Sequence, residues 1–250
     1  MKVHTGLPNA SRPTPKPAQG NAAPGKGYPD ALRVYVEPWD TGMAPNITGG
    51  VCTLATCKPA IRRCTKIGHE WILATGAVKT LMHVEGGKKF ENWKDRINYA
   101  MVPDERLSYD DYFHDPRFAA KIPHTRQDPG DNLYHLDAAG KKYQAVDCVN
   151  KIHSTNDRME PIDFTRVDLS APEALVAHDF WYWGDHAPHL SETGLKPKTI
   201  QTILHAKRGH LVVRDPEVIK DVVDWLRTQK PGIHGQPRQR QLLSEFDAIV

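Results

Sequence analysis

Cysteine is scarce in this chain, with four residues in 250. Secreted scaffolds stapled by disulfides use more cysteine in shorter chains, so this class is excluded and we expect reduced thiols. The residues after Met1 include the basic Lys2 but not the apolar stretch of a secretory signal. No apolar run approaches the ~18 residues that cross a bilayer. We therefore expect a cytoplasmic protein that is not inserted in a membrane.

The chain also lacks the short motifs of nucleotide-cofactor enzymes. It has no Gly-x-Gly-x-x-Gly after a strand, no phosphate-loop lysine, no His-Glu-x-x-His and no nucleophile elbow. Its formal net charge of +3 is too small to make the whole surface bind a polyanion, so only local basic clusters bear on that function. The sequence assigns no cofactor.

The material that is present suits one globular domain, with 39% hydrophobic and 25% charged residues. Residues 1–30 contain six prolines, four Lys or Arg and one acidic residue, which predicts a disordered basic tail. We expect a single domain over residues 31–230. Residues 231–250 begin with a Pro-Gly pair and are expected to form a C-terminal tail without regular packing.

The pattern of apolar residues predicts an α+β fold. Alternating or β-branched runs are typical of strands, and they occur at residues 32–36, 51–55, 71–75, 80–84, 96–102 and 180–184. The run at 51–55 fits the start of a short helix equally well. Ser108 is expected to cap a helix with an aromatic inner face, and Asp215 an amphipathic C-terminal helix. We therefore predict a strand-rich mixed sheet or small barrel with flanking helices.

Three cysteines in the first half of the domain are candidates for chemistry. With His69, the residues Cys52, Cys57 and Cys64 offer four ligands to zinc, but their separations of five and seven residues are wider than those of structural zinc sites. Cys57 or Cys64 lies beside Arg62, Arg63 and Lys66, whose positive charge favours a nucleophilic thiolate. No local signature identifies a base for it, and ordinary buried thiols remain an alternative.

A second candidate for chemistry follows the aromatic block. Asp185 and His186, with His189, have the residue types of a site with two histidines and one carboxylate that holds a metal. Imidazoles scattered over a polar loop are the alternative.

Aromatic, polar and basic residues elsewhere suggest contacts with nucleic acid. Trp181 and Trp183 offer flat faces on which a base could stack, although strand alternation turns part of this block towards the core. The residues 123–142 form a long loop, which is a common place for function. The short basic clusters could contact phosphates if folding brings them together, and solvated surface charge is the alternative.

Four segments resemble the nucleotide modification associated domain 2 family. They are residues 41–46, 50–63, 130–134 and 180–184, and the order of Gly, Cys, Lys, Pro and Arg in the second segment is the most distinctive. The resemblance spans most of residues 32–228. It implies a role in DNA base hypermodification and names no reaction.

These features combine into one hypothesis, in which the domain recognises or processes a modified nucleobase in DNA or a nucleotide. In this hypothesis aromatic residues stack on the base, polar residues bind its edge and arginines hold the backbone. These are, in turn, Trp181 and Trp183; Asp131 and Asn132; and Arg62, Arg63 and Arg208.

Two alternatives remain open. The first is an enzyme that completes a base modification, with Cys57 as nucleophile or with Asp185, His186 and His189 as metal ligands. The second is a non-catalytic partner protein in a DNA-modification or phage-defence complex, which would bind other proteins through its tails.

Overall fold

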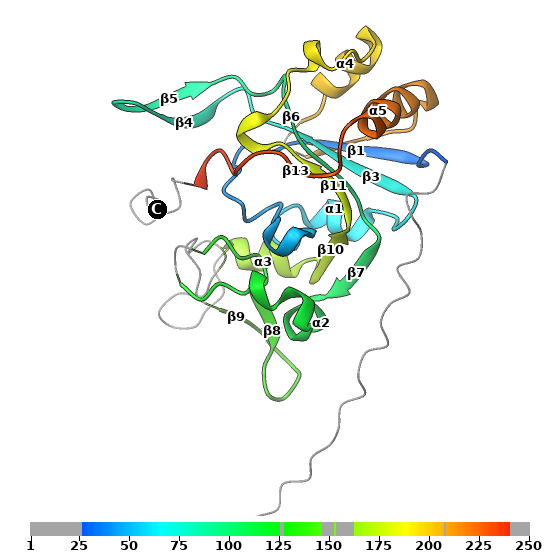
Figure 1. Ribbon diagram of the computed structural model, residues 1–250. Helices are drawn as coiled ribbons and strands as arrows, with labels where there is room; N and C mark the ends of the chain where they lie inside the picture. Colours follow the sequence, from blue (N-terminus) through cyan, green and yellow to red (C-terminus); the bar gives the residue numbers. More distant parts are fainter. Residues whose placement is uncertain (1–26, 126–127, 147–152, 154–162, 208, 241–250) are drawn as a thin grey trace, which may run out of the picture.

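The computed structural model describes residues 27–125, 128–146, 153, 163–207 and 209–240 (Figure 1). Its strands are β1 Ala31–Val36, β2 Cys52–Leu54, β3 Glu70–Thr75, β4 Thr80–Val84, β5 Gly87–Glu91, β6 Ile97–Val102, β7 Glu105–Ser108, β8 Tyr134–Leu136, β9 Tyr143–Ala145, β10 Glu173–Ala177, β11 Asp179–Tyr182, β12 His210–Val213 and β13 Gly232–Ile233. Its α-helices are α1 Pro59–Cys64, α2 Tyr109–His114, α3 Asp163–Leu169, α4 Pro197–Leu204 and α5 Pro216–Thr228. Residues 1–26 and 241–250 of the two predicted tails lie outside the described residues.

A mixed six-stranded sheet forms the centre of the molecule, with strand order β12-β1-β3-β6-β11-β13. β1 is parallel to β3 and β11 is parallel to β13, while the other neighbouring pairs are antiparallel. The predicted α+β class with a mixed sheet is therefore confirmed. The sheet ends in two edges, β12 and β13, and the strands described here close no barrel, so the barrel alternative is wrong. Its two faces pack against different layers instead (Figure 1).

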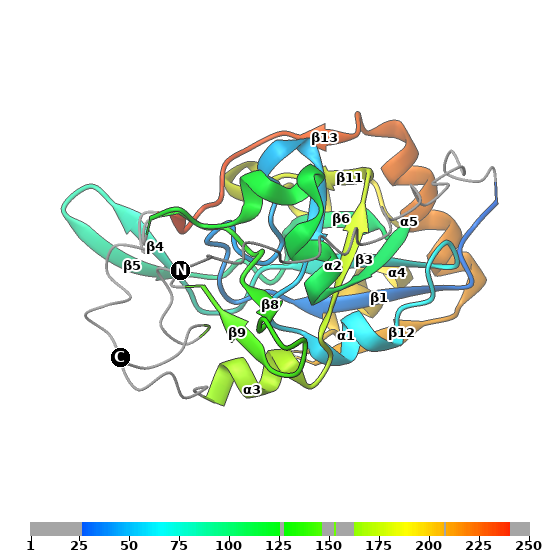
Figure 2. The ribbon, with the colours of Figure 1, turned by 90° about the horizontal axis from the view of Figure 1, so that it is seen from below.

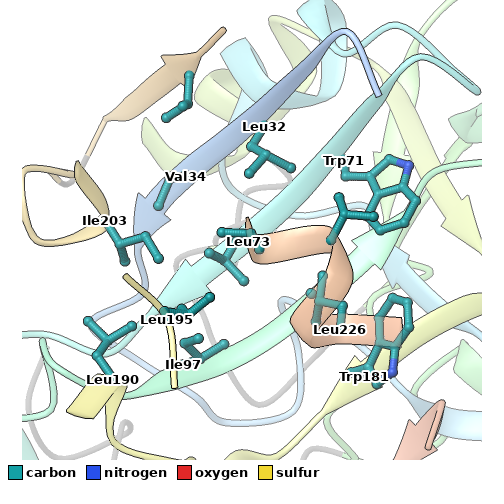
Figure 3. Close-up of a cluster of buried hydrophobic side chains, with 14 of the residues drawn as sticks. Leu32, Val34, Trp71, Leu73, Ile97, Trp181, Leu190, Leu195, Ile203 and Leu226 are labelled. Atoms are coloured by element: carbon teal, nitrogen blue, oxygen red, sulfur yellow. The ribbon is translucent and has the colours of Figure 1, made fainter. Parts of the chain in front are cut away.

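Helices α4 and α5 cover one face of this sheet. Figure 3 shows Leu32 and Val34 of β1 and Leu73 of β3 gathered with side chains such as Ile203 and Leu226 in one buried cluster. α5 is the predicted amphipathic C-terminal helix, and the side chain of its N-cap, Asp215, accepts hydrogen bonds from two backbone N–H groups of the first turn. Within the described part of the chain, no helix is both long enough and apolar enough to cross a membrane.

The opposite face packs against a second sheet, β2-β10-β7, and helix α1. Beyond it, α2 and β8 enclose a further buried cluster with several tyrosines. The side chain of Ser108 caps α2 by accepting a hydrogen bond from the backbone N–H of Asp111, as the sequence predicts. Figure 2 shows α1 and α3 close together on this side of the molecule, and the two helices are in contact. This layer carries the turn between β2 and α1, which contains Cys57.

The C-terminal segment is packed further than the sequence indicates. β13 pairs with β11, and Arg238 lies buried with its guanidinium 3.9 Å from Glu37 and 3.8 Å from Asp40. Arg238 Nη1 also donates to Asn98 Oδ1. Burial raises the pKa of both carboxyls, and the guanidinium opposes this rise. The expected loss of packing therefore does not occur between residues 231 and 239, because a cluster of buried charged side chains anchors this segment.

Candidate active site

Cys57 lies in a strained turn between a strand and a helix. β2 ends at Leu54 and α1 begins at Pro59. Between them Cys57 and Lys58 have positive φ angles, 58° and 47°. Such angles are uncommon for residues with a Cβ, and strained positions of this kind concentrate at functional sites. A strained turn from strand to helix also presents the nucleophile in α/β-hydrolases, although their sequence motif is absent here. Cys57 is half-buried.

His153 and Asp168 complete a chain of polar contacts with this thiol. His153 Nε2 is 3.6 Å from Cys57 Sγ, within the distance for a hydrogen bond to sulfur. His153 Nδ1 is 2.6 Å from Asp168 Oδ2. His153 and Asp168 are both buried. A thiol, an imidazole and a carboxylate connected in this order form the arrangement that activates a cysteine nucleophile.

The carboxylate of Asp168 is held from several sides. The backbone N–H of Cys57 donates to Oδ1 at 2.7 Å, and the hydroxyl of Tyr134 donates to Oδ2 at 2.8 Å. The guanidinium of Arg62 lies 3.7 Å from Oδ1. These partners satisfy both oxygens of the buried carboxylate, and they fix the direction in which it meets His153.

The electrostatics of the site favour a protonated His153. Burial lowers the pKa of His153, but the negative charges of Cys57 and Asp168 outweigh this effect and raise it from 6.5 to about 10. An imidazolium close to sulfur stabilises a thiolate, which is the reactive form of cysteine. The site therefore places the proton-holding imidazole of His153 next to Cys57 Sγ, an arrangement that favours attack by the sulfur.

The same three side chains could also hold a metal ion. In the described part of the chain, their ligand atoms lie within 4.8 Å of one another. Zinc uses neutral histidine, thiolate and carboxylate ligands, so the residue types suit it. However, Asp168 already accepts a hydrogen bond from His153 Nδ1. A carboxylate in this position orients the histidine and does not itself bind the metal. That leaves Cys57 and His153 as direct ligands, fewer than the three protein ligands of catalytic zinc sites. The three residues therefore include each part of an activated cysteine nucleophile, but they offer too few direct ligands for a catalytic zinc ion.

The predicted metal ligands after the aromatic block lie elsewhere. Asp185 and His186 belong to a short 3-10 helix, Gly184–His186, and their side chains are exposed. Asp185 Oδ1 accepts from the backbone N–H of Gln236 at 2.8 Å, and His186 Nδ1 lies 2.8 Å from the carbonyl of His234. Their contacts hold the C-terminal segment. Among the residues described, neither this set nor the set of Cys52, Cys64 and His69 assembles as a metal site.

Arg62, which the sequence suggests as a phosphate contact, is fully buried. Its Nε donates to the carbonyl of Cys57 at 2.8 Å, and its Nη2 donates to that of Asp168 at 3.1 Å. Its Nη1 donates to the carbonyls of Ala171 and Glu173. Arg62 thus ties the turn of the nucleophile to the end of α3, and its position supports a structural role in the site.

The neighbouring Arg63 is exposed, and its Nη1 makes one long hydrogen bond, 3.4 Å, to the carbonyl of Ser170. It is the one predicted backbone contact whose described side chain reaches solvent. The third, Arg208, lies outside the described residues.

The predicted base-edge residues, Asp131 and Asn132, are buried and bonded within the chain. Thr53 Oγ1 and Tyr112 OH each donate to the Asp131 carboxylate at 2.8 Å. Asn132 Nδ2 donates to the carbonyl of Tyr112 at 3.0 Å. These bonds fix residues 131–132, just before β8, against β2 and α2, so they support a structural role for both residues.

The predicted stacking residues are core residues in this fold. Trp181 and Trp183 are 3% and 6% exposed. Trp181 packs against Trp71, with ring centroids 6.2 Å apart, and Trp183 stacks on Trp225 at 5.3 Å. Their faces are therefore covered by the protein itself.

Reasoning from the sequence found Cys57 but not its partners. His153 is 96 residues from Cys57 and 15 from Asp168 in the chain, and no known motif joins them at those separations. The chain has thirteen histidines, so residue type alone does not single out His153. Only the folded chain places it between the thiol and the carboxylate.

Fold and site together define an α+β protein with a thiol, imidazole and carboxylate site. The chain belongs to the nucleotide modification associated domain 2 family, whose model matches residues 30–244. The predicted family is thereby confirmed, and its description associates the chain with nucleotide modification. Comparison with curated proteins and with solved structures finds no match.

Proposed function

We propose that the protein is an enzyme of nucleotide modification that uses Cys57 as a nucleophile on a nucleobase or on a group attached to it. The observation that carries the proposal is the alignment of Cys57 Sγ, His153 and Asp168, with contacts of 3.6 Å and 2.6 Å. The family description supports the class of substrate.

Each residue of the site has a separate task. His153 Nε2 takes the proton of the thiol, so that Cys57 Sγ attacks as a thiolate. Sγ bonds to an electrophilic carbon of the substrate, and the bond to the leaving group breaks as His153 passes its proton to that group. Water then attacks the same carbon and gives its proton to His153, while the bond to Sγ breaks and the thiolate is freed. Asp168 accepts a hydrogen bond from His153 Nδ1–H throughout, which keeps the imidazole in the correct orientation.

The proposal extends to DNA as the carrier of the base and to the cytoplasm as the compartment. DNA base hypermodification is the role that the resemblance to the family implies. A reducing compartment protects a reactive thiol from oxidation. Arg63 is retained as a candidate backbone contact because its side chain is exposed. Trp181, Trp183 and the other buried candidates are left out of the proposed substrate contacts.

The test compares the wild-type chain with Cys57→Ser on hypermodified DNA and on plain DNA of the same sequence. Nucleosides recovered from each reaction are analysed by mass spectrometry, and the mass of the intact protein is measured to detect a covalent adduct. We expect a change in nucleoside mass with the wild type and none with Cys57→Ser. Cys64→Ser is the matched control, because Cys64 is exposed and is not part of the site.

The other outcomes separate the alternatives. Preferential binding of modified DNA without any change in mass, in both proteins, would make the protein a reader of modified bases and would refute the enzyme. No binding and no mass change on either DNA would favour a partner protein in a modification complex.

A further inference from the structure

The hairpin of β4 and β5 projects from the body of the molecule (Figure 1). We call residues 78–92, which contain this hairpin, the arm. Its base is anchored: Trp93, which follows it, is buried, and the backbone N–H of Trp93 donates to the carbonyl of Ala77 at 2.8 Å. A Cβ on Gly76 would lie 2.5 Å from Trp93 Cβ, so the chain on either side of the arm is tightly packed. Gln239 Nε2 also donates to the carbonyl of Leu81 at 2.9 Å. The arm is thus held at its base while its tip projects.

The pairing of β4 and β5 defines the two faces of the arm. Leu81 pairs with Phe90, and Met82 pairs with Lys89. Because side chains alternate along a strand and paired residues share a face, Lys88 lies on the face of Phe90, opposite to that of Met82. Met82 packs against the main hydrophobic core. The face with Lys88 and Phe90 therefore points away from the body.

This outward face combines apolar and basic groups. Phe90 on this face is 66% exposed, the highest value among the large hydrophobic side chains that are exposed in the described residues. Lys88 on the same face is exposed. Lys89, which shares the face of Met82, and Lys79, at the start of the arm, are exposed as well. The arm has two acidic residues, Glu85 at its turn and Glu91. Glu91 accepts a hydrogen bond from Trp93 Nε1 at 2.9 Å and lies 2.7 Å from Lys89.

We propose that the arm binds double-stranded DNA by laying this face in the major groove. A two-stranded ribbon fits the ~12 Å width of the B-form major groove, whereas the major groove of A-form RNA is too narrow for it. Lysines at the edge of the ribbon meet the phosphates, which provide affinity. Phe90 has the apolar surface that contacts a thymine methyl group in the groove. Two strands of five residues span about 17 Å along the groove.

The proposal deepens the proposed function, on which it rests for the nature of the substrate, by stating that the base is presented in a duplex. The two are measured separately. Binding of DNA tests the arm, and alkylation of the Cys57 thiol by iodoacetamide tests the site. Failure of one measurement leaves the other proposal standing.

The experiment measures binding of the full chain to a short fluorescent DNA duplex by fluorescence anisotropy over a range of salt concentrations. We compare the wild type with Lys88→Ala/Lys89→Ala and with Phe90→Ser. The matched control is Lys141→Ala/Lys142→Ala, which removes an adjacent pair of exposed lysines from the other hairpin, β8 and β9. Thermal unfolding and Cys57 alkylation confirm that each variant remains folded.

We expect the lysine variant to lose about tenfold in affinity and to lower the slope of log affinity against log salt by about two, since two phosphate contacts are removed. Phe90→Ser should weaken binding severalfold without changing the slope, because an apolar contact releases no ions. The control should bind within about twofold of the wild type, and double-stranded RNA should compete poorly with DNA.

Three results would overturn the proposal. The first is an arm variant that binds as the control does. The second is wild-type protein that binds no duplex DNA at any salt concentration. The third is a dimer or a protein complex that Phe90→Ser disrupts while DNA binding is unchanged, which would assign the arm to a protein partner.

Discussion

The backbone N–H of Cys57 donates to Asp168 Oδ1 at 2.7 Å. The other oxygen of the same carboxylate, Oδ2, lies 2.6 Å from His153 Nδ1. One carboxylate therefore positions both the turn of the nucleophile and the ring of the base. Its removal should disturb two parts of the site at once, which makes Asp168 the most informative position to change.

Asp168→Asn should slow the reaction of Cys57 with iodoacetamide at least about tenfold, because the amide cannot accept from both Cys57 N–H and His153 Nδ1–H. Peptide mass spectrometry over a time course measures the rate at each cysteine separately. The exposed Cys64 serves as the internal reference, since its rate should not change. Tyr134→Phe removes one hydrogen bond to Asp168, at about 1 kcal/mol of stability, and should retain most of the reactivity. Wild-type reactivity in Asp168→Asn would contradict the assigned role.

The ionisation of His153 should make stability depend on pH. Burial lowers its pKa, but Cys57 and Asp168 raise it to about 10, so the folded chain retains a proton that the unfolded chain releases near pH 6.5. This stabilisation is fully present below pH 6.5 and is lost as the pH rises through about 10.

Urea unfolding at a series of pH values measures this effect. The free energy of unfolding should fall between pH 6.5 and 10, by up to about 5 kcal/mol. His153→Gln should remove this contribution to the slope. If the wild type and His153→Gln show the same dependence on pH, His153 does not hold the proton in the folded chain.

Arg62→Met should destabilise the fold by about 3–5 kcal/mol, because it leaves several buried carbonyl groups and the Asp168 carboxylate without their cationic partner. Arg63→Met is a control of the same chemistry one residue away. Its exposed side chain should contribute within about 0.5 kcal/mol. Urea unfolding measures both. A small loss of unfolding free energy for Arg62→Met, accompanied by weaker DNA binding, would instead support the phosphate contact that the sequence suggests.

Trp183→Ala should lower the free energy of unfolding by about 3–5 kcal/mol, since it opens a cavity next to Trp225 in the main core. Trp39→Ala removes the same side chain from a position that is 41% exposed, and it should cost much less. Chemical denaturation compares the two. A stable Trp183→Ala variant with impaired DNA binding would instead support a stacking role.

Much of the fold could be predicted from local patterns. The alternation at residues 32–36 and 96–102 predicts the strands that become β1 and β6, and Asp215 with Pro216 marks the start of α5. These signals are local because capping and alternation depend on neighbouring residues. The choice between an open sheet and a barrel could not be made this way, since it depends on whether β12 and β13, at opposite ends of the sheet, meet.

The candidate site was predictable only in part. The sequence alone determined that Cys57 lies next to Lys58 and Pro59 and close to the Arg62-Arg63 pair, because that is a property of adjacent residues. Tertiary structure alone decided that His153 meets this thiol, that Asp168 meets His153, and that Arg62, Asp131 and Trp181 are buried. The physical reason is that burial and side-chain contact depend on which distant segments pack together. Residue type limits what a side chain can do, and the packing of residues far apart in the chain decides which of those roles it has the partners for.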